Sequence, residues 1–175
     1  DSFSYPWPQN FGDYGKFWSN KSNKKKLIKV LNFLLKVDRA KWLKIINNIG
    51  LNIPTIVDPS AEISKYAFLE KGSFINTNVV IQCNTKIEFG SILNTSCTID
   101  HDSTIGEGTH ISPGVNIAGN VNIGKFCWIG IGSKIIQNIQ IGDNVTVGGG
   151  SLVLKDIPKN LKVFGSPINV IKENK

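Results

Sequence analysis

The sequence predicts a mainly β protein, a parallel β-helix of six-residue repeats preceded by a short N-terminal α/β or helical segment. Two observations lead to this prediction. Aliphatic residues stand at every sixth position from Val57 to Val153 without interruption. The composition also changes near residue 50, because the first 50 of the 175 residues hold ten Lys and Arg against three Asp and Glu, whereas the rest hold ten of each. The whole formal charge of +7 therefore lies on the front of the chain.

The six-residue period fits neither an α-helix, which repeats every 3.6 residues, nor an alternating strand. It fits a short strand followed by a tight corner. Three such units, 18 residues in all, close one triangular coil, and stacked coils rise by about 4.8 Å each. The aliphatic residues would point into the prism, and the mostly small residues two positions before them would fit its corners. We expect residues 55–157 to form this β-helix and residues 158–175 to form a C-terminal tail.

Residues that are 18 positions apart stack in adjacent coils, so the outward positions form columns. Cys83, His101 and Gly119 share one column, and a ligand could therefore lie against bare backbone beside His101. Histidine is the natural base for acyl transfer near neutral pH, and the Gly119 N–H could hold an oxyanion. Asp100 or Asp102 could orient the imidazole ring, and Asp102 is our preferred partner.

The second histidine, His110, comes nine residues after His101, which is half a coil. The two side chains should therefore face different sides of one chain and share a site only where subunits meet. Trp128 stacks one coil beyond His110 and could either wall such a cleft or serve ordinary subunit packing.

The segment 94–102, NTSCTIDHD, followed by IGEGTHISPGVNIAGNVNIG, resembles the bacterial sugar acetyltransferases typified by PglD, NeuD and the perosamine N-acetyltransferases, which belong to the hexapeptide-repeat family. The resemblance runs from about Thr55 to Pro167. It implies a left-handed parallel β-helix, a homotrimer with active sites between protomers, acetyl-CoA as co-substrate and no metal. Family members acetylate amino groups of nucleotide-linked aminosugars or hydroxyls of sialic acid, and their products enter lipopolysaccharide O-antigen, capsule or other polysaccharide synthesis.

The resemblance also implies roles for individual residues. His101 and Asp102 correspond to the catalytic base and its carboxylate neighbour. Asn94 corresponds to a residue near the acceptor, and His110 to a histidine that contacts acetyl-CoA. The other implied coenzyme-binding residues are Ala118, Gly119, Ile131, Gly149, Gly165 and Pro167, the last two within a G-x-P motif.

Residues 1–54 form a basic, aromatic-rich segment in which no G-x-G-x-x-G phosphate-binding loop occurs. The resemblance implies a strand, a short loop and a helix in its last part, VLNFLLKVDRAKWLKIINNIG, as in a truncated Rossmann-like, nucleotide-sugar-binding domain. Its lysines could then meet substrate phosphates. Two other interpretations stay open, a weak contact with an anionic membrane surface and a simply solvated face. No nucleic-acid-binding fold accompanies the lysines, so we expect no nucleic acid partner.

The predicted function is acetyl-CoA-dependent N-acetylation of a nucleotide-linked aminosugar by direct transfer, with a histidine as general base. One alternative is O-acetylation of a sugar such as sialic acid or of another small hydroxyl acceptor. The other is a non-catalytic β-helix that serves assembly. The three cysteines show no CxxC spacing, which favours free thiols in a reducing compartment, so we expect the cytoplasm.

Overall fold

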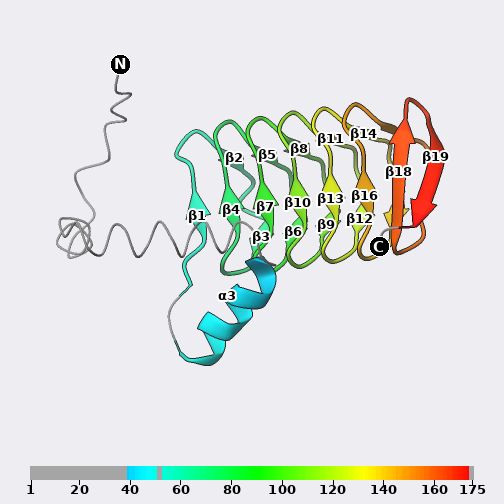
Figure 1. Ribbon diagram of the computed structural model, residues 1–175. Helices are drawn as coiled ribbons and strands as arrows, with labels where there is room; N and C mark the ends of the chain where they lie inside the picture. Colours follow the sequence, from blue (N-terminus) through cyan, green and yellow to red (C-terminus); the bar gives the residue numbers. More distant parts are fainter. Residues whose placement is uncertain (1–38, 51–52, 174–175) are drawn as a thin grey trace, which may run out of the picture. The chain divides into compact units, whose positions relative to one another are not determined.

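The computed structural model describes residues 39–50 and 53–173 (Figure 1). These residues form a parallel β-helix, with helix α3 (Arg39–Asn48) beside it and an antiparallel strand pair at its C-terminal end. The predicted mainly β fold with a short preceding helical segment is confirmed. Residues 1–38 lie outside the described residues, and with them the strand expected before the helix and the membrane-contact and phosphate-contact hypotheses. None of the helices described has the length and apolar character that membrane crossing requires.

Three parallel sheets form the three sides of the prism. The first sheet runs in the order β1 (Ile56–Val57), β4 (Phe74–Ile75), β7 (Ile92–Leu93), β10 (His110–Ile111), β13 (Trp128–Ile129), β16 (Thr146–Val147), β18 (Leu161–Gly165) and β19 (Ile168–Glu173). The second runs in the order β17 (Leu152–Val153), β14 (Lys134–Ile135), β11 (Asn116–Ile117), β8 (Thr98–Ile99), β5 (Val80–Ile81) and β2 (Glu62–Ile63). The third runs in the order β15 (Gln140–Ile141), β12 (Asn122–Ile123), β9 (Thr104–Ile105), β6 (Lys86–Ile87) and β3 (Phe68–Leu69).

The core is the column of inward aliphatic residues that the six-residue period predicted. From Ile75 to Val153, each of them is at least 95% buried, and each buried isoleucine contributes about 1.5–3 kcal/mol to folding. The first coil differs. Val57 keeps 42% of its surface exposed, because it lies in the first coil that the structure describes and no other described coil stacks on its N-terminal side.

The small corner residues satisfy their polar groups inside the prism. The hydroxyls of Ser91 and Thr109 donate hydrogen bonds to the carbonyls of Gly106 (3.0 Å) and Gly124 (2.8 Å) in the next coil. Ser133 does the same to Gly148 at 3.0 Å. Buried hydroxyls are tolerated when they are paired in this way, so these serines and threonines also tie each corner to the next.

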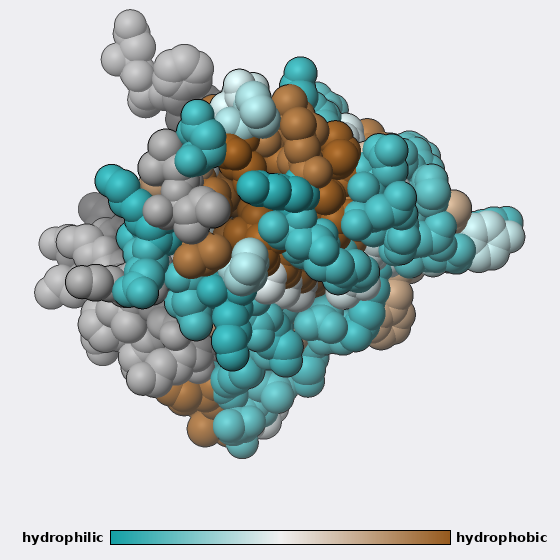
Figure 2. Space-filling view, turned by 90° about the vertical axis from the view of Figure 1, so that its right-hand side faces the viewer, coloured by the Kyte–Doolittle hydropathy of each residue, from teal (hydrophilic) through white to brown (hydrophobic). Residues whose placement is uncertain are grey.

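Residues 158–175, predicted as a tail, contain two strands that extend the first sheet. Strand β18 pairs in parallel with β16, and β19 then pairs antiparallel with β18. The Phe164 ring occupies the space in which Gly148 would carry a Cβ atom, so a larger residue at 148 would not fit. Figure 2 looks onto this end and shows apolar side chains exposed among hydrophilic ones.

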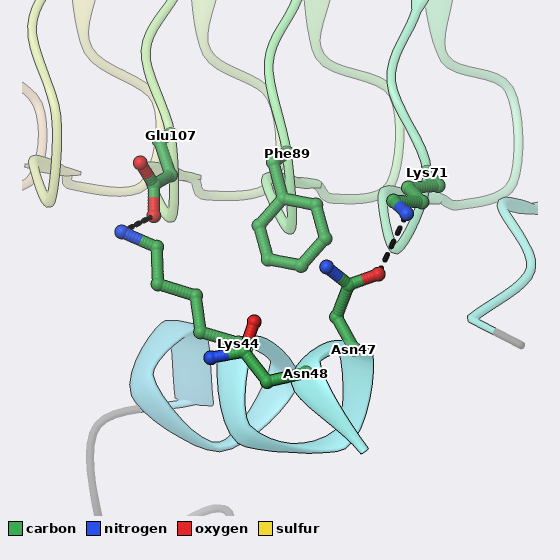
Figure 3. A pocket seen from close by; sticks show the side chains of 6 residues that line it. All are labelled: Lys44, Asn47, Asn48, Lys71, Phe89 and Glu107. Carbon is green, nitrogen blue, oxygen red and sulfur yellow. Dashed lines mark hydrogen bonds and ion pairs between the residues drawn. The ribbon is translucent and has the colours of Figure 1, made fainter. Parts of the chain in front are cut away.

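Helix α3 contacts the corner between the third and first sheets through polar side chains (Figure 3). Lys44 forms an ion pair with Glu107, and Lys71 Nζ donates a hydrogen bond to Asn47 Oδ1 at 2.6 Å. Phe89, in the coil between these two contacts, lies against the same pocket. The helix therefore spans three successive turns, 18 residues apart, along one corner of the prism.

Candidate active site

His101 and Asp102 lie in the turn at residues 100–103, at the corner that joins the second and third sheets. We call this corner, with its turns at residues 82–85, 100–103 and 118–121, the His101 corner. His101 Nδ1 lies 2.7 Å from Asp102 Oδ2. Asp100 makes a different contact, because its Oδ1 accepts the backbone N–H of His101 at 2.8 Å. The geometry thus selects Asp102 over Asp100 as the ring partner.

The backbone of Asp102 explains this pairing. Its φ is +57°, in the left-handed region, and its N–H donates to the carbonyl of Cys83 in the preceding coil at 3.1 Å. Asp and Asn are the non-glycine residues that tolerate this conformation best. The turn brings the Asp102 carboxylate back toward its neighbour's ring, although adjacent residues in an extended strand point to opposite faces.

Gly119 lies directly beside the imidazole ring in the next coil, as the predicted column requires. A Cβ atom at residue 119 would lie only 2.6 Å from Cε1 and 2.7 Å from Nε2 of His101. Glycine is therefore required here if the ring is to keep its place. In the part of the chain that the structure describes, no acceptor takes the Gly119 N–H.

The carboxylates beside His101 raise the pKa of its imidazole. Its hydrogen bond to Asp102 is the largest effect and raises the pKa of His101 above the usual 6.5, with help from the charges of Asp100 and Asp102 and against a smaller desolvation effect. The pKa of Asp102 is lowered, first by His101 and then by Asn84. The His101 side chain is 54% exposed. Since Nδ1 faces Asp102, the nitrogen available to a substrate is Nε2.

His110 lies on the outward side of the first sheet, not at the His101 corner. Its ring lies 4.4 Å from that of Trp128, centroid to centroid, at 50°, and its Nε2 lies 3.4 Å from Asn94 Nδ2. Asn94 is itself fixed, because its Oδ1 accepts the Thr95 N–H at 2.8 Å and Asn76 Nδ2 at 3.0 Å. We call the outward side chains of Asn94, His110 and Trp128 the His110 face.

The implied coenzyme-binding residues lie at several places on the prism. Ala118 and Gly119 belong to the His101 corner. Ile131 and Gly149 stack at the corner between the first and second sheets, where a Cβ atom at 149 would lie 3.1 Å from Ile131 Cγ2. Gly165 ends β18 in the first sheet, and Pro167 lies in the turn before β19. Within one chain, the structure thus places Ala118 and Gly119 at the His101 corner and leaves the other implied coenzyme-binding residues away from that corner.

Asn84 was missed by the sequence reasoning although it contacts Asp102. Its Nδ2 donates to Asp102 Oδ1 at 3.0 Å. The spacing of 18 residues between the two positions was the signal that could have revealed it. Among the residues described, no three His, Cys, Asp or Glu side chains lie close enough to hold a metal ion.

Two family models match parts of the chain. Residues 120–155 match the bacterial transferase hexapeptide (six repeats) family. Residues 1–53 match a family described as "putative O-antigen biosynthesis protein". No curated protein sequence matches the chain.

Solved structures resemble most of the chain. The acetyltransferase domain of PglB from Neisseria gonorrhoeae is 33% identical, with a TM-score of 0.74 over 75% of this chain and 64% of that one. The same domain in complex with acetyl coenzyme A is 32% identical, with a TM-score of 0.72 over 76% of this chain and 67% of that one. PerB from Caulobacter crescentus, in complex with CoA and GDP-perosamine, is 30% identical, with a TM-score of 0.75 over 77% and 64%. The chain therefore spans 64% of the length of the first and third of these structures.

Proposed function

The chain belongs to the hexapeptide-repeat family of sugar acetyltransferases, and from this premise we propose that it transfers the acetyl group of acetyl-CoA to the amino group of a nucleotide-linked aminosugar. The observation that carries the proposal is the geometry of His101. Its Nδ1 is paired with Asp102 at 2.7 Å, its ring lies against the bare backbone of Gly119, and its side chain is half exposed. This is the arrangement that a general base for acyl transfer needs.

His101 moves one proton in the proposed reaction. As the amine nitrogen bonds to the acetyl carbonyl carbon, Nε2 accepts the proton that the amine loses, and the carbonyl oxygen becomes negative. The bond between that carbon and sulfur then breaks, the carbonyl re-forms, and Nε2 returns the proton to the departing sulfur. Asp102 stabilises the imidazolium between these two steps, so no covalent acyl-enzyme is required.

Gly119 has two roles in this proposal. Its missing side chain lets the thioester approach the ring, and its N–H, which no described group accepts, could stabilise the negative oxygen. Ala118 lies beside it. We propose that the coenzyme continues along His110, Ile131 and Gly149 toward Gly165 and Pro167, and that Asn94 contacts the acceptor.

We also propose a homotrimer in which the His101 corner of one protomer meets the His110 face of the next. The supporting observation is that the implied residues form two groups on different sides of one chain, one at the His101 corner and one along the His110 face and the neighbouring corner. Neither of these partial sites alone holds all of the implied residues. We place the enzyme in the cytoplasm. All three cysteines are free thiols, which fits a reducing compartment.

The test is an assay of the purified chain with acetyl-CoA and a panel of acceptors. The panel holds nucleotide-linked aminosugars, free aminosugars and sialic acid, and the acetylated product is identified by mass spectrometry. We expect the nucleotide-linked amines to react fastest and His101→Ala to lower turnover about 10²- to 10⁴-fold. Preferential acetylation of a hydroxyl would replace the N-acetyltransferase with the O-acetyltransferase. Absence of acetyl-CoA binding in calorimetry would favour a non-catalytic assembly role.

A further inference from the structure

We propose that Asn84 is a positioning residue that holds the Asp102 carboxylate against His101. This inference rests on the proposed function in so far as His101 is the base. The Asn84 side chain donates its hydrogen bond to Asp102 and not to His101. It would act only through Asp102, whose two oxygens receive one side-chain donor each.

The β-helix itself brings Asn84 and Asp102 together. They occupy the same position in consecutive turns of the His101 corner, 18 residues apart, and both have a φ of +57°. The backbone N–H of Asn84 donates to the Tyr66 carbonyl at 3.2 Å, just as that of Asp102 donates to Cys83 at 3.1 Å. With the same backbone conformation and one coil of separation, the Asn84 amide lies next to the Asp102 carboxylate.

The hydrogen bonds of Asp102 show why a second donor matters. Asp102 Oδ2 faces His101 Nδ1 at 2.7 Å, and Oδ1 accepts Asn84 Nδ2 at 3.0 Å. The Asp102 side chain is 51% exposed, so the surrounding protein does little to restrict its rotamer. Asn84 binds one oxygen of the carboxylate and His101 binds the other. The two contacts together fix the orientation in which Oδ2 reaches the ring.

The contact differs from the hydrogen bonds that join asparagines of adjacent turns elsewhere in the described residues, which we call asparagine ladders. Asn120 Nδ2 donates to Asn138 Oδ1 at 2.8 Å, and Asn144 Nδ2 donates to Asn160 Oδ1 at 3.0 Å. These ladders join one neutral amide to another. At position 102 the acceptor is a carboxylate that also pairs with His101. The hydrogen bond from Asn84 therefore acts, through this carboxylate, on a ring that titrates.

Among the residues that the structure describes, the charges that act on His101 are those of Asp100 and Asp102, so its titration can be interpreted. Asp102 and Asp100 come from its own turn, and Cys83 occupies its column in the preceding coil. The following coil presents Gly119, which carries no charge. Asn84 is neutral, so its removal takes no charge away from His101 and acts on the ring only through Asp102.

The experiment measures the His101 pKa directly by NMR, from the Cε1–H signal as a function of pH. The chain has only two histidines, so His110 provides an internal reference. Asn84→Gly removes the amide, and glycine accepts the left-handed conformation. Asn84→Ser is a second variant, because Ser96 already adopts a φ of +56° in this chain. Asn144→Gly is the matched control, since it removes a ladder bond at another corner.

We expect both Asn84 variants to lower the His101 pKa toward its ordinary value. The reason is that Asp102, whose hydrogen bond raises this pKa, is held less firmly beside the ring. The His110 titration should not move, and Asn144→Gly should move neither histidine. kcat/KM for acetyl transfer should fall about fivefold in both Asn84 variants, which corresponds to one ordinary hydrogen bond. In an Asp102→Asn background, Asn84→Gly should produce no further change in either measurement.

Two results would overturn the proposal. One is a His101 titration that stays at the wild-type position in both Asn84 variants. The other is an equal effect of Asn84→Gly with and without Asp102→Asn, which would indicate a purely structural role. The NMR measurement needs no substrate, so failure of the acetyltransferase assay would leave the positioning role testable by itself.

Discussion

The imidazole ring of His101 lies so close to Gly119, one coil further along the chain, that a Cβ atom at 119 would approach Nε2 to 2.7 Å. The six-residue repeat therefore affects the proposed reaction directly. The register that stacks the coils also sets a residue without a side chain beside the proposed base.

Gly119→Ala should therefore displace the His101 ring and lower kcat/KM about 10- to 100-fold, because a misplaced catalytic group loses much of its effect. Thermal unfolding should change little, since the ring is half exposed and can move into solvent. Gly114→Ala is the control. A Cβ atom there meets nothing within 4 Å, although φ is +66°, so it should lower stability by about 1–2 kcal/mol and leave activity unchanged. Full activity in Gly119→Ala would contradict this role.

The sequence predicted the architecture well because the period of six leaves little freedom. An uninterrupted aliphatic column from Val57 to Val153 specifies inward positions, register and coil length together. The stacking of His101 on Gly119 and of His110 on Trp128 followed from the 18-residue step alone. The strands β18 and β19 did not, because residues 158–173 leave the period and their pairing depends on the free edge of the first sheet.

Side-chain detail at the site was predicted less completely. The choice of Asp102 over Asp100 depends on a left-handed φ, which the repeat does not encode. The contact from Asn84 was missed because asparagine is common in these turns and its partner lies a full coil away. A periodic sequence indicates which residues are neighbours, whereas side-chain hydrogen bonds depend on local backbone conformation.

The pH dependence of catalysis should follow His101. A general base acts when it is neutral, so kcat/KM should increase with pH, and the midpoint should lie above 6.5 because the bond to Asp102 raises the pKa of His101. Asp102→Asn removes the negative charge, so the midpoint should move to lower pH and the plateau should fall about 10- to 100-fold. Asn84 and Asn120 adopt the same turn conformation, so this variant should fold. A midpoint that stays in place would contradict the pairing.

The loss of stability caused by an isoleucine-to-valine substitution should depend on how deeply the residue is buried. Ile105→Val removes one methylene group from a fully buried site and should lower the free energy of unfolding by about 0.5–1.5 kcal/mol. Ile56→Val removes the same group where the residue is 54% exposed, so its effect should fall within about 0.5 kcal/mol of zero. Urea unfolding monitored by circular dichroism compares the two. Equal losses would contradict the burial pattern of the coils.

The proposed site between protomers can be tested by complementation. His101→Ala and His110→Ala should each lose activity, but trimers assembled from an equal mixture of both should regain about a quarter of the wild-type sites. In a closed ring, each cleft pairs one protomer's corner with the next protomer's face. A random mixture combines an intact His101 corner with an intact His110 face in about one cleft of four. The assay is acetyl transfer after co-expression, with separately purified and then mixed variants as the control for exchange. Mixed trimers without activity would show that each chain carries a complete site, and the split between the two partial sites would then need another explanation.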